Sequence, residues 1–286
     1  MKKFILKVLL FIFFVPIILF GSYFSVDTYL NRQNGENGLF IWGDSQMYQG
    51  VDLSELSART GENVFSSARH GAGVYDFLVF TEKVPDHSKV IIALSKPAII
   101  RKKNRDRNIS GLSISSLFLL WNNGYSFDEL ISIVNKNRQP TKLFTNNSIL
   151  FPESDSIVLS EPLSLFEDAY SSIPNYFDDK QAIYISGIKT LKRKQCDIIL
   201  LDFPFHPLLK EIENRSILKS KSREFEKMVL RNFKVYTMDT IHLDMNKELM
   251  FDLTHLNKKG AFDVSIELSQ KIKIKEPVLY RIEWRD

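Results

Sequence analysis

The chain has 286 residues, of which 44% are hydrophobic and 25% charged, a composition typical of a folded globular protein and not of a disordered one. This length is enough for one large domain or two small ones. The formal net charge is +4, and the three lysines before residue 8 supply most of it, so the rest carries only +1. A nearly neutral body argues against general binding to nucleic acid.

An apolar segment lies at the N-terminus. Lys2, Lys3 and Lys7 precede residues 8–24, which are uncharged throughout. This run is just long enough to cross a thin hydrocarbon core, and its basic flank favours a cytoplasmic N-terminus. A cleaved secretory signal is the alternative, but no Ala-x-Ala site follows. We therefore predict a single-pass anchor over residues 1–24 in the inner (cytoplasmic) membrane, with the remaining chain on the periplasmic or extracellular side.

A strand that ends in a serine follows the anchor. Residues 25–38 are polar and rich in Asn and Gly, which predicts a linker. Residues 39–42 form a short apolar strand pattern that stops at Gly43-Asp44-Ser45, ahead of a helical pattern over 46–59. A hydroxyl placed there would lie at the carboxyl edge of a sheet, beside helix N-terminal N–H groups that can stabilise an oxyanion. Ser45 is therefore the candidate nucleophile.

Apolar runs of strand length alternate with helical patterns along much of the remaining chain. The run at 89–94 is apolar nearly throughout, which is typical of a strand buried on both faces of a parallel sheet. The alternation predicts a doubly wound α/β domain with a mostly parallel sheet over residues 39–286. For the tail at 273–286 we consider an added edge strand, without assigning it a place in the sheet. Further strands are expected at 63–67, 196–202 and 234–238, and further helices at 74–83, 180–194, 219–230 and 257–271.

Residues 98–180 interrupt this alternation and exceed the length of an ordinary loop. They begin with a basic cluster, residues 101–107, and contain a capping-box pattern that starts a helix at Ser126. We predict a cap insertion over the strand ends, built of short helices and irregular chain. Its aromatic side chains either stack on sugar rings or fill the cap's own core. The basic cluster is either a solvated face or a contact for an anionic glycan or lipid headgroup.

A base for Ser45 is available far downstream. Asp252 and His255 are three residues apart, so a helical turn or a tight loop places both side chains on one side. The carboxylate can hold one ring N–H of His255, which leaves the other nitrogen to accept the Ser45 proton. Each pattern alone is weak. The serine after the first strand and the pair before the last helix together predict a Ser45–His255–Asp252 triad.

Other reactive side chains are few. Cys196 is the single cysteine and lies on an apolar strand, so we interpret it as a small core residue. No Cys/His metal cluster is visible, and we predict neither a metal nor a cofactor. His70 and His206 compete with His255 for a place in the site. His206 lies in a loop after a strand and is a candidate for substrate contact.

These motifs resemble blocks of the SGNH, or GDSL, hydrolase superfamily. Gly43-Asp44-Ser45 is similar to its first block, and Asp252-Leu-Thr-His255 is similar to its last. The second block of that superfamily supplies a glycine whose N–H joins the oxyanion hole, beside the N–H of the nucleophile. Gly71 is the better match for this glycine and Gly73 is its rival.

The third block of the superfamily usually supplies an asparagine donor. Residues 90–97 stand at that place and contain no asparagine, so the resemblance leaves Ser95 or Lys96 as the substitute. Both are also candidates for substrate binding, as is Arg101 shortly after the same strand.

The apolar segment ahead of the Gly-Asp-Ser strand resembles the architecture of membrane-anchored members, the DltD-like and alginate O-acetylation proteins. The resemblance implies a three-layer α/β/α domain that transfers or hydrolyses O-acyl groups, chiefly acetyl, on a cell-surface polysaccharide or glycolipid. It also implies the lipid bilayer and a membrane-bound acyltransferase as partners. The resemblance does not distinguish an esterase from a transferase. The alternatives are a catalytically inactive module that binds a glycan or the acyltransferase, and an envelope protein whose motifs coincide by chance.

Overall fold

The molecule is known from a computed structural model. The predicted anchor at 1–24, residues 25–37 of the linker and most of the insertion lie outside the residues it describes, as do Ser95, Lys96 and Arg101. Among the helices of the described part, none is long and apolar enough to cross a bilayer. The described residues are 38–94, 114–122, 125–126, 128, 130, 144–153, 177–215, 218–244, 249–272 and 276–285.

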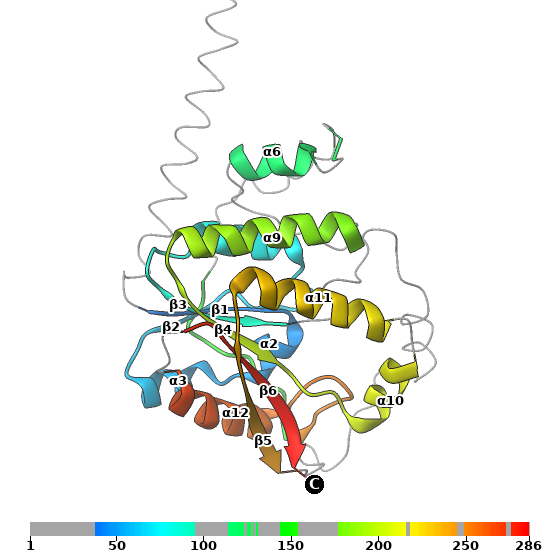
Figure 1. The fold of residues 1–286 in the computed structure, drawn as a ribbon. Coiled ribbons are helices and arrows are strands. Elements are labelled where there is room, and N and C mark those ends of the chain that lie inside the picture. The colour runs from blue at the N-terminus through cyan, green and yellow to red at the C-terminus, as the bar shows by residue number, and fades with distance from the viewer. Residues whose placement is uncertain are drawn as a thin grey trace, which may run out of the picture.

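A six-stranded parallel sheet forms the centre of the described chain (Figure 1). In space the strands follow the order β2-β1-β3-β4-β6-β5. The chain moves from β1 outward to β2 and then returns across β1 to β3, so the winding direction reverses beside β1. This confirms the predicted α/β class with a mostly parallel sheet. The strands are β1 (Leu39–Trp42), β2 (Val64–Ser66), β3 (Lys89–Ala93), β4 (Asp197–Asp202), β5 (Thr237–Asp244) and β6 (Val278–Arg285).

Strand β1 is buried along its whole length because helices cover both faces of the sheet. Successive side chains of a strand point to opposite faces. Accordingly Phe40 and Trp42 belong to one hydrophobic core, and Leu39 and Ile41 belong to the other. This explains why the strand is apolar without interruption. It also fixes Ser45, three residues after the strand, at the carboxyl edge of the sheet.

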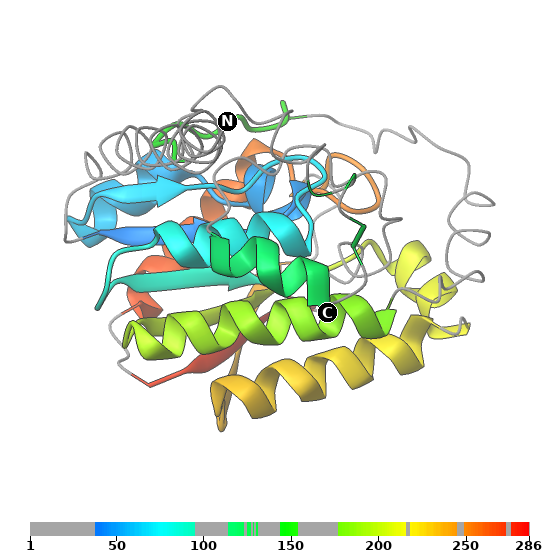
Figure 2. The ribbon, with the colours of Figure 1, turned by 90° about the horizontal axis from the view of Figure 1, so that it is seen from above.

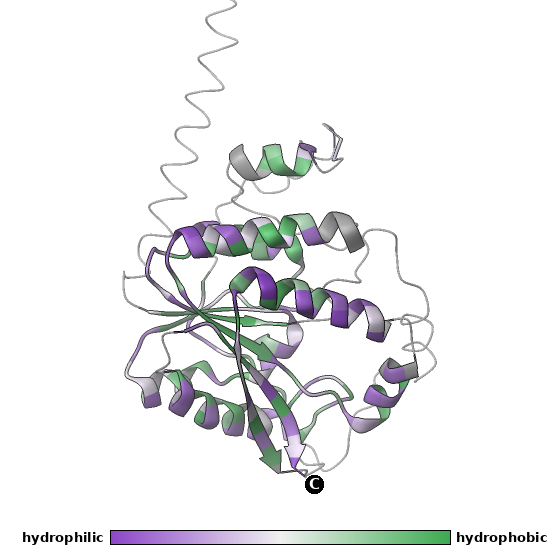
Figure 3. Cartoon of the chain, viewed as in Figure 1, coloured by the Kyte–Doolittle hydropathy of each residue, from purple (hydrophilic) through white to green (hydrophobic). Residues whose placement is uncertain are grey.

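Two groups of helices enclose the sheet (Figures 1 and 2). On one face α4 (Val74–Lys83), α9 (Phe177–Arg193) and α11 (Leu218–Phe233) contribute to the first core. On the other face α2 (Ser45–Gly50), α3 (Leu53–Thr60) and α12 (Lys258–Lys271) contribute to the second. Their apolar sides turn toward the strands and their polar sides turn outward, as Figure 3 shows. Two further helices, α6 (Ile114–Asn122) and α10 (Pro207–Arg215), complete those of the described residues.

The helix predicted over 46–59 is in fact two helices, α2 and α3. Val51 adopts an extended conformation after α2, and Asp52 then caps α3 by accepting hydrogen bonds from the N–H groups of Ser54 and Glu55 at 3.0 and 3.2 Å. An Asp at an N-cap satisfies donors that would otherwise lack partners, so it starts a new helix at low cost. Helix α10 was not predicted. It begins at Pro207, because the fixed φ of proline suits the first helical position.

The C-terminal tail is not an edge strand. It forms β6, which lies inside the sheet and pairs in parallel with both β4 and β5. Val278, Leu279 and Tyr280 are fully buried, whereas the later residues Glu283 and Arg285 are exposed, so only the second half of the strand shows an alternating pattern. The edge position belongs to β5. That strand starts later than predicted, because Lys234 takes a left-handed φ of 58° beyond the end of α11.

Candidate active site

Ser45 is the first residue of α2 and follows β1 through a tight turn. Asp44 is the N-cap of this helix, and its carboxylate accepts a hydrogen bond from the N–H of Gln46 at 3.1 Å. The N–H of Ser45 has no acceptor within the helix, because the first residues of a helix lack partners four positions earlier. Ser45 is buried, with 8% of the residue exposed. The turn therefore offers a shielded hydroxyl beside an available N–H group.

Gly43 makes this turn possible. A Cβ atom on residue 43 would lie 2.4 Å from the Cβ of Met47 and 2.8 Å from the Cβ of Ala93. Real Cβ atoms do not approach other carbons so closely, so only glycine lets β1 pass under α2 and beside β3 at this point. Gly43 thus holds Ser45 in place through packing.

Substituting Gly43 by alanine should destabilise the protein by about 1–3 kcal/mol, because the added methyl overpacks the turn. Urea denaturation of the full chain measures the change. Gly61→Asn is the matched control: Gly61 has a φ of 68° and open space around it, a conformation that asparagine tolerates. A Gly43→Ala chain as stable as the wild type would show that the turn is not as tight as described.

Asp252 and His255 are hydrogen-bonded, as predicted from their spacing. The Oδ2 atom of Asp252 lies 2.7 Å from the Nδ1 atom of His255. The other carboxylate oxygen accepts hydrogen bonds from the backbone N–H groups of Thr254 and His255, at 2.7 and 2.8 Å. These contacts fix the carboxylate, and the carboxylate fixes the ring. The Nε2 atom of His255 is buried and has no hydrogen-bond partner in the described part of the chain.

The charge state of Asp252 follows from the same contacts. Burial would raise the pKa of this carboxyl, but the hydrogen bond from His255, the nearby imidazole charge and the donors of Thr254 outweigh burial and hold the pKa below its ordinary value of 3.8. Asp252 is thus a carboxylate at neutral pH. A carboxylate at Nδ1 keeps the proton on that nitrogen and leaves Nε2 free to accept another.

Acidification tests this carboxylate. Because the pKa of Asp252 is lower in the folded chain than in the unfolded one, its ionisation stabilises the fold at neutral pH, and this contribution is lost as the pH falls through the depressed pKa. The Asp252→Asn chain should therefore lose less stability than the wild type between about pH 6 and about pH 3. Urea denaturation of both chains at each pH gives the comparison. Equal losses would mean that Asp252 does not titrate with a depressed pKa.

The serine turn and the histidine loop meet directly. The side-chain Nε2 of Gln46, next to Ser45, donates a hydrogen bond to the carbonyl oxygen of Thr254, next to His255, at 3.1 Å. Ser45 and His255 therefore lie at the same edge of the sheet although 210 residues separate them. The Ser45 hydroxyl does not hydrogen-bond to Nε2 of His255, since that atom has no partner.

The loop after β2 is attached to the same turn. The N–H of Arg69 donates to the carbonyl oxygen of Gly43 at 3.2 Å. Gly71 has a φ of 75°, the left-handed region that favours glycine. The N–H of Gly73 donates to Oδ2 of Asp76 at 2.8 Å and is thus occupied. Of the two glycines that were considered as oxyanion donors, Gly71 is the one whose N–H is not taken up by a described residue.

The two competing histidines make contacts other than the one that defines the pair Asp252–His255. The ring centroid of His70 is 6.5 Å from that of His255, and its Nε2 atom lies 3.2 Å from Nε2 of Gln49. The ring nitrogen Nδ1 of His206 accepts a hydrogen bond from the N–H of Leu208 at 3.3 Å, at the start of α10. Its backbone N–H donates to the carbonyl oxygen of Leu253. His206 thus supports the histidine loop through its backbone.

Part of the insertion reaches the site, and no sequence pattern predicted which part. The Phe151 ring stacks on Phe251 with centroids 3.9 Å apart and meets the His255 ring edge-on at 5.5 Å. Thr145 exchanges backbone hydrogen bonds with Ser66 at the end of β2. Phe151 therefore packs against the histidine loop, whereas Thr145 and Ser148 hold the same segment against β2 and the start of α3. An isolated phenylalanine in an irregular segment carries no pattern that would have identified it.

Cys196 does not compete with Ser45 as a nucleophile. Burial raises the pKa of its thiol to about 11, so the group stays protonated at neutral pH. Within the described residues, no group of three or more His, Cys, Asp or Glu side chains is arranged to bind a metal ion. The sequence matches no protein-family model and no curated protein. Any assignment of function therefore depends on the geometry of the site.

Proposed function

We propose that the protein transfers or hydrolyses O-acyl groups, chiefly acetyl, through an acyl-enzyme on Ser45, in the manner of SGNH hydrolases. The observation that carries the proposal is the state of the His255 ring. One nitrogen is held by the Asp252 carboxylate at 2.7 Å, and the other is buried without a partner. A buried polar atom without a partner costs free energy in a resting protein, and such costs are typical of functional sites.

In the proposed reaction, Nε2 of His255 removes the proton from Ser45 as the serine oxygen attacks the acyl carbonyl. The N–H groups of Ser45 and Gly71 take up the negative charge on the carbonyl oxygen. The protonated His255 then gives its proton to the departing alcohol. A water molecule or a sugar hydroxyl, deprotonated by the same nitrogen, releases the acyl group in the second half of the reaction.

The substrate in this proposal is an acylated cell-surface polysaccharide or glycolipid. Its support is the apolar N-terminal segment, which would hold the domain at a membrane, with a membrane-bound acyltransferase as the source of acyl groups in the transfer reaction. Water as the acceptor gives an esterase and a sugar hydroxyl gives a transferase. The acceptor depends on what the cap insertion admits.

One observation favours the second candidate, an inactive module that binds a glycan or a membrane partner. The Ser45 hydroxyl is not hydrogen-bonded to His255 in the described structure, so the proposed base does not contact the proton that it would remove. In unliganded enzymes such contacts are often long and tighten only around the substrate.

Labelling with a fluorophosphonate probe separates the two candidates. The full-length wild type should form a covalent adduct at Ser45, because only an activated serine attacks the probe at neutral pH. Ser67 offers a matched control: it is also buried, at the end of the neighbouring strand, and its hydroxyl contacts the carbonyl oxygen of Ile41 at 3.4 Å. The Ser67→Ala chain should label normally. A folded wild type that does not label would support the inactive module.

A further inference from the structure

A cavity lies at the carboxyl edge of the sheet, beside the candidate active site. It has a volume of about 440 Å³ and lies between the ends of β4 and β6, the start of α11 and the loop before α10. Neither Ser45 nor His255 lines it. Phe203 lies between the two sites: it lines the cavity, and its ring packs so closely on α2 that a Cβ on Gly50 would come within 2.5 Å of it.

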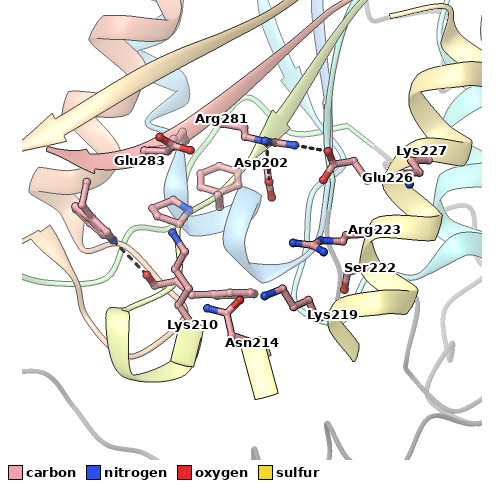
Figure 4. A pocket seen from close by; sticks show the side chains of 15 residues that line it. Asp202, Lys210, Asn214, Lys219, Ser222, Arg223, Glu226, Lys227, Arg281 and Glu283 are labelled. Carbon is pink, nitrogen blue, oxygen red and sulfur yellow. Dashed lines mark hydrogen bonds and ion pairs between the residues drawn. The ribbon is translucent and has the colours of Figure 1, made fainter. Parts of the chain in front are cut away.

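The walls of the cavity carry more positive than negative charge. Five Lys or Arg side chains line it against three Asp or Glu side chains. Arg281 is neutralised by Glu226, with which it forms a salt bridge, and by Asp202 at 3.9 Å. The remaining cations include Lys210, Lys219 and Arg223, which form no salt bridge in the described structure. Figure 4 shows their charged ends directed toward the same space.

A buried hydroxyl accompanies these cations. Ser222 lines the cavity, is only 6% exposed, and its Oγ atom has no hydrogen-bond partner among the described residues. A buried hydroxyl without a partner is costly, and a ligand that accepts its proton would remove that cost. Lys219, the second residue of the 16-residue helix α11, also lines the cavity, so the N-terminal end of this helix borders it. The dipole of such a helix end favours an anion.

From these contacts we infer that the cavity binds a ligand bearing a phosphate group. Three cations that form no salt bridge with a described residue and a hydroxyl donor surround one space, which suits a tetrahedral dianion with three terminal oxygens better than a carboxylate with one charge and two oxygens. Arg223 can donate two parallel hydrogen bonds to such a group, and the two lysines supply point charges. The aromatic residues Phe203, Phe205 and Trp284 line the rest of the cavity and suit an uncharged portion of the same ligand.

Phosphate binding to the full-length chain tests this inference. Calorimetric titration with inorganic phosphate and with glycerol 3-phosphate should give saturable binding. The double substitution Lys219→Met with Arg223→Gln should weaken it about tenfold or more, because each removes a charged donor. Lys221→Gln is the matched control on the same helix, since the Lys221 amine pairs with Glu224 at 3.1 Å and does not line the cavity. It should bind as the wild type does.

A further variant and a competition experiment complete the test. If the double variant does not fold, Lys210→Gln alone, on α10, should still weaken binding severalfold, because it removes one converging charge. Competition by phosphatidic acid vesicles against glycerol 3-phosphate would identify a lipid headgroup as the source of the phosphate, and no competition would identify a soluble ester. A wild type without saturable binding, or a double variant that binds equally well, would overturn the inference. The Ser45→Ala chain should bind phosphate as the wild type does. Phosphate binding therefore tests the cavity independently of the proposed catalysis by Ser45.

Discussion

Alanine at position 45 should reduce the hydrolysis of an activated acetyl ester, such as p-nitrophenyl acetate, by a factor on the order of 10⁴ or more. The proposed reaction forms its covalent bond through the Ser45 oxygen, which alanine lacks. The thiol of Cys196 is protonated at neutral pH and lies before β4, at the opposite edge of the sheet from Ser45. Steady-state rates of the purified full-length chain measure the loss.

Stability must be controlled in this comparison. Ser45 is a buried polar residue at the first position of α2, so its replacement could in principle disturb the helix start. Alanine is a good helix former, and Asp44, which caps the helix, is unchanged. The melting temperature of the Ser45→Ala chain should therefore stay close to that of the wild type. An ester-hydrolysis rate that survives the substitution would show that any activity resides elsewhere.

Replacing His255 by glutamine should lower the same rate by at least about 10³-fold. Glutamine keeps much of the volume and polarity of the ring but cannot accept a proton at neutral pH. The loss should appear in kcat more than in KM, because the base acts in the transition state and does not hold the substrate. Steady-state kinetics over a range of ester concentrations separates these two constants.

His70 provides the matched control for His255. The two rings lie 6.5 Å apart at the same edge of the sheet; His255 has the Asp252 carboxylate at Nδ1, and the Nε2 atom of His70 lies against Gln49. The His70→Gln chain should therefore keep most of its activity. A large loss in His70→Gln together with a small loss in His255→Gln would assign the base to His70, and the triad proposed here would be wrong.

Much of the fold could be predicted because burial leaves a local signature. β1 and β3 are covered on both faces, so they are apolar except for Lys89 at the start of β3, and the helix over Val74–Lys83 has the bounds that its pattern predicted. The position of the C-terminal strand could not be predicted. β6 enters between β4 and β5, and the choice between an edge and an interior place depends on pairing between distant segments, which no local pattern encodes.

In the candidate site, too, local contacts could be predicted and tertiary contacts could not. The spacing of Asp252 and His255 was sufficient to predict their hydrogen bond, because both residues lie within one short loop. The contact between Gln46 and Thr254 was not predictable, although it joins the serine turn to the histidine loop. Phe151 was missed for the same reason, since its place against His255 results from the path of the insertion. Contacts that need tertiary structure leave no trace in residue spacing.

The most direct measurement is mass spectrometry of the intact full-length chain after brief exposure to p-nitrophenyl acetate, followed by digestion to locate the acetyl group. The account predicts a single acetyl on Ser45, its absence in the Ser45→Ala chain, and its faster loss when an acceptor polysaccharide is added if the protein is a transferase. Loss at the same rate with water alone would indicate an esterase. Acetyl groups on lysines only, or equal acetylation of the Ser45→Ala chain, would contradict the central claim that Ser45 is an activated nucleophile.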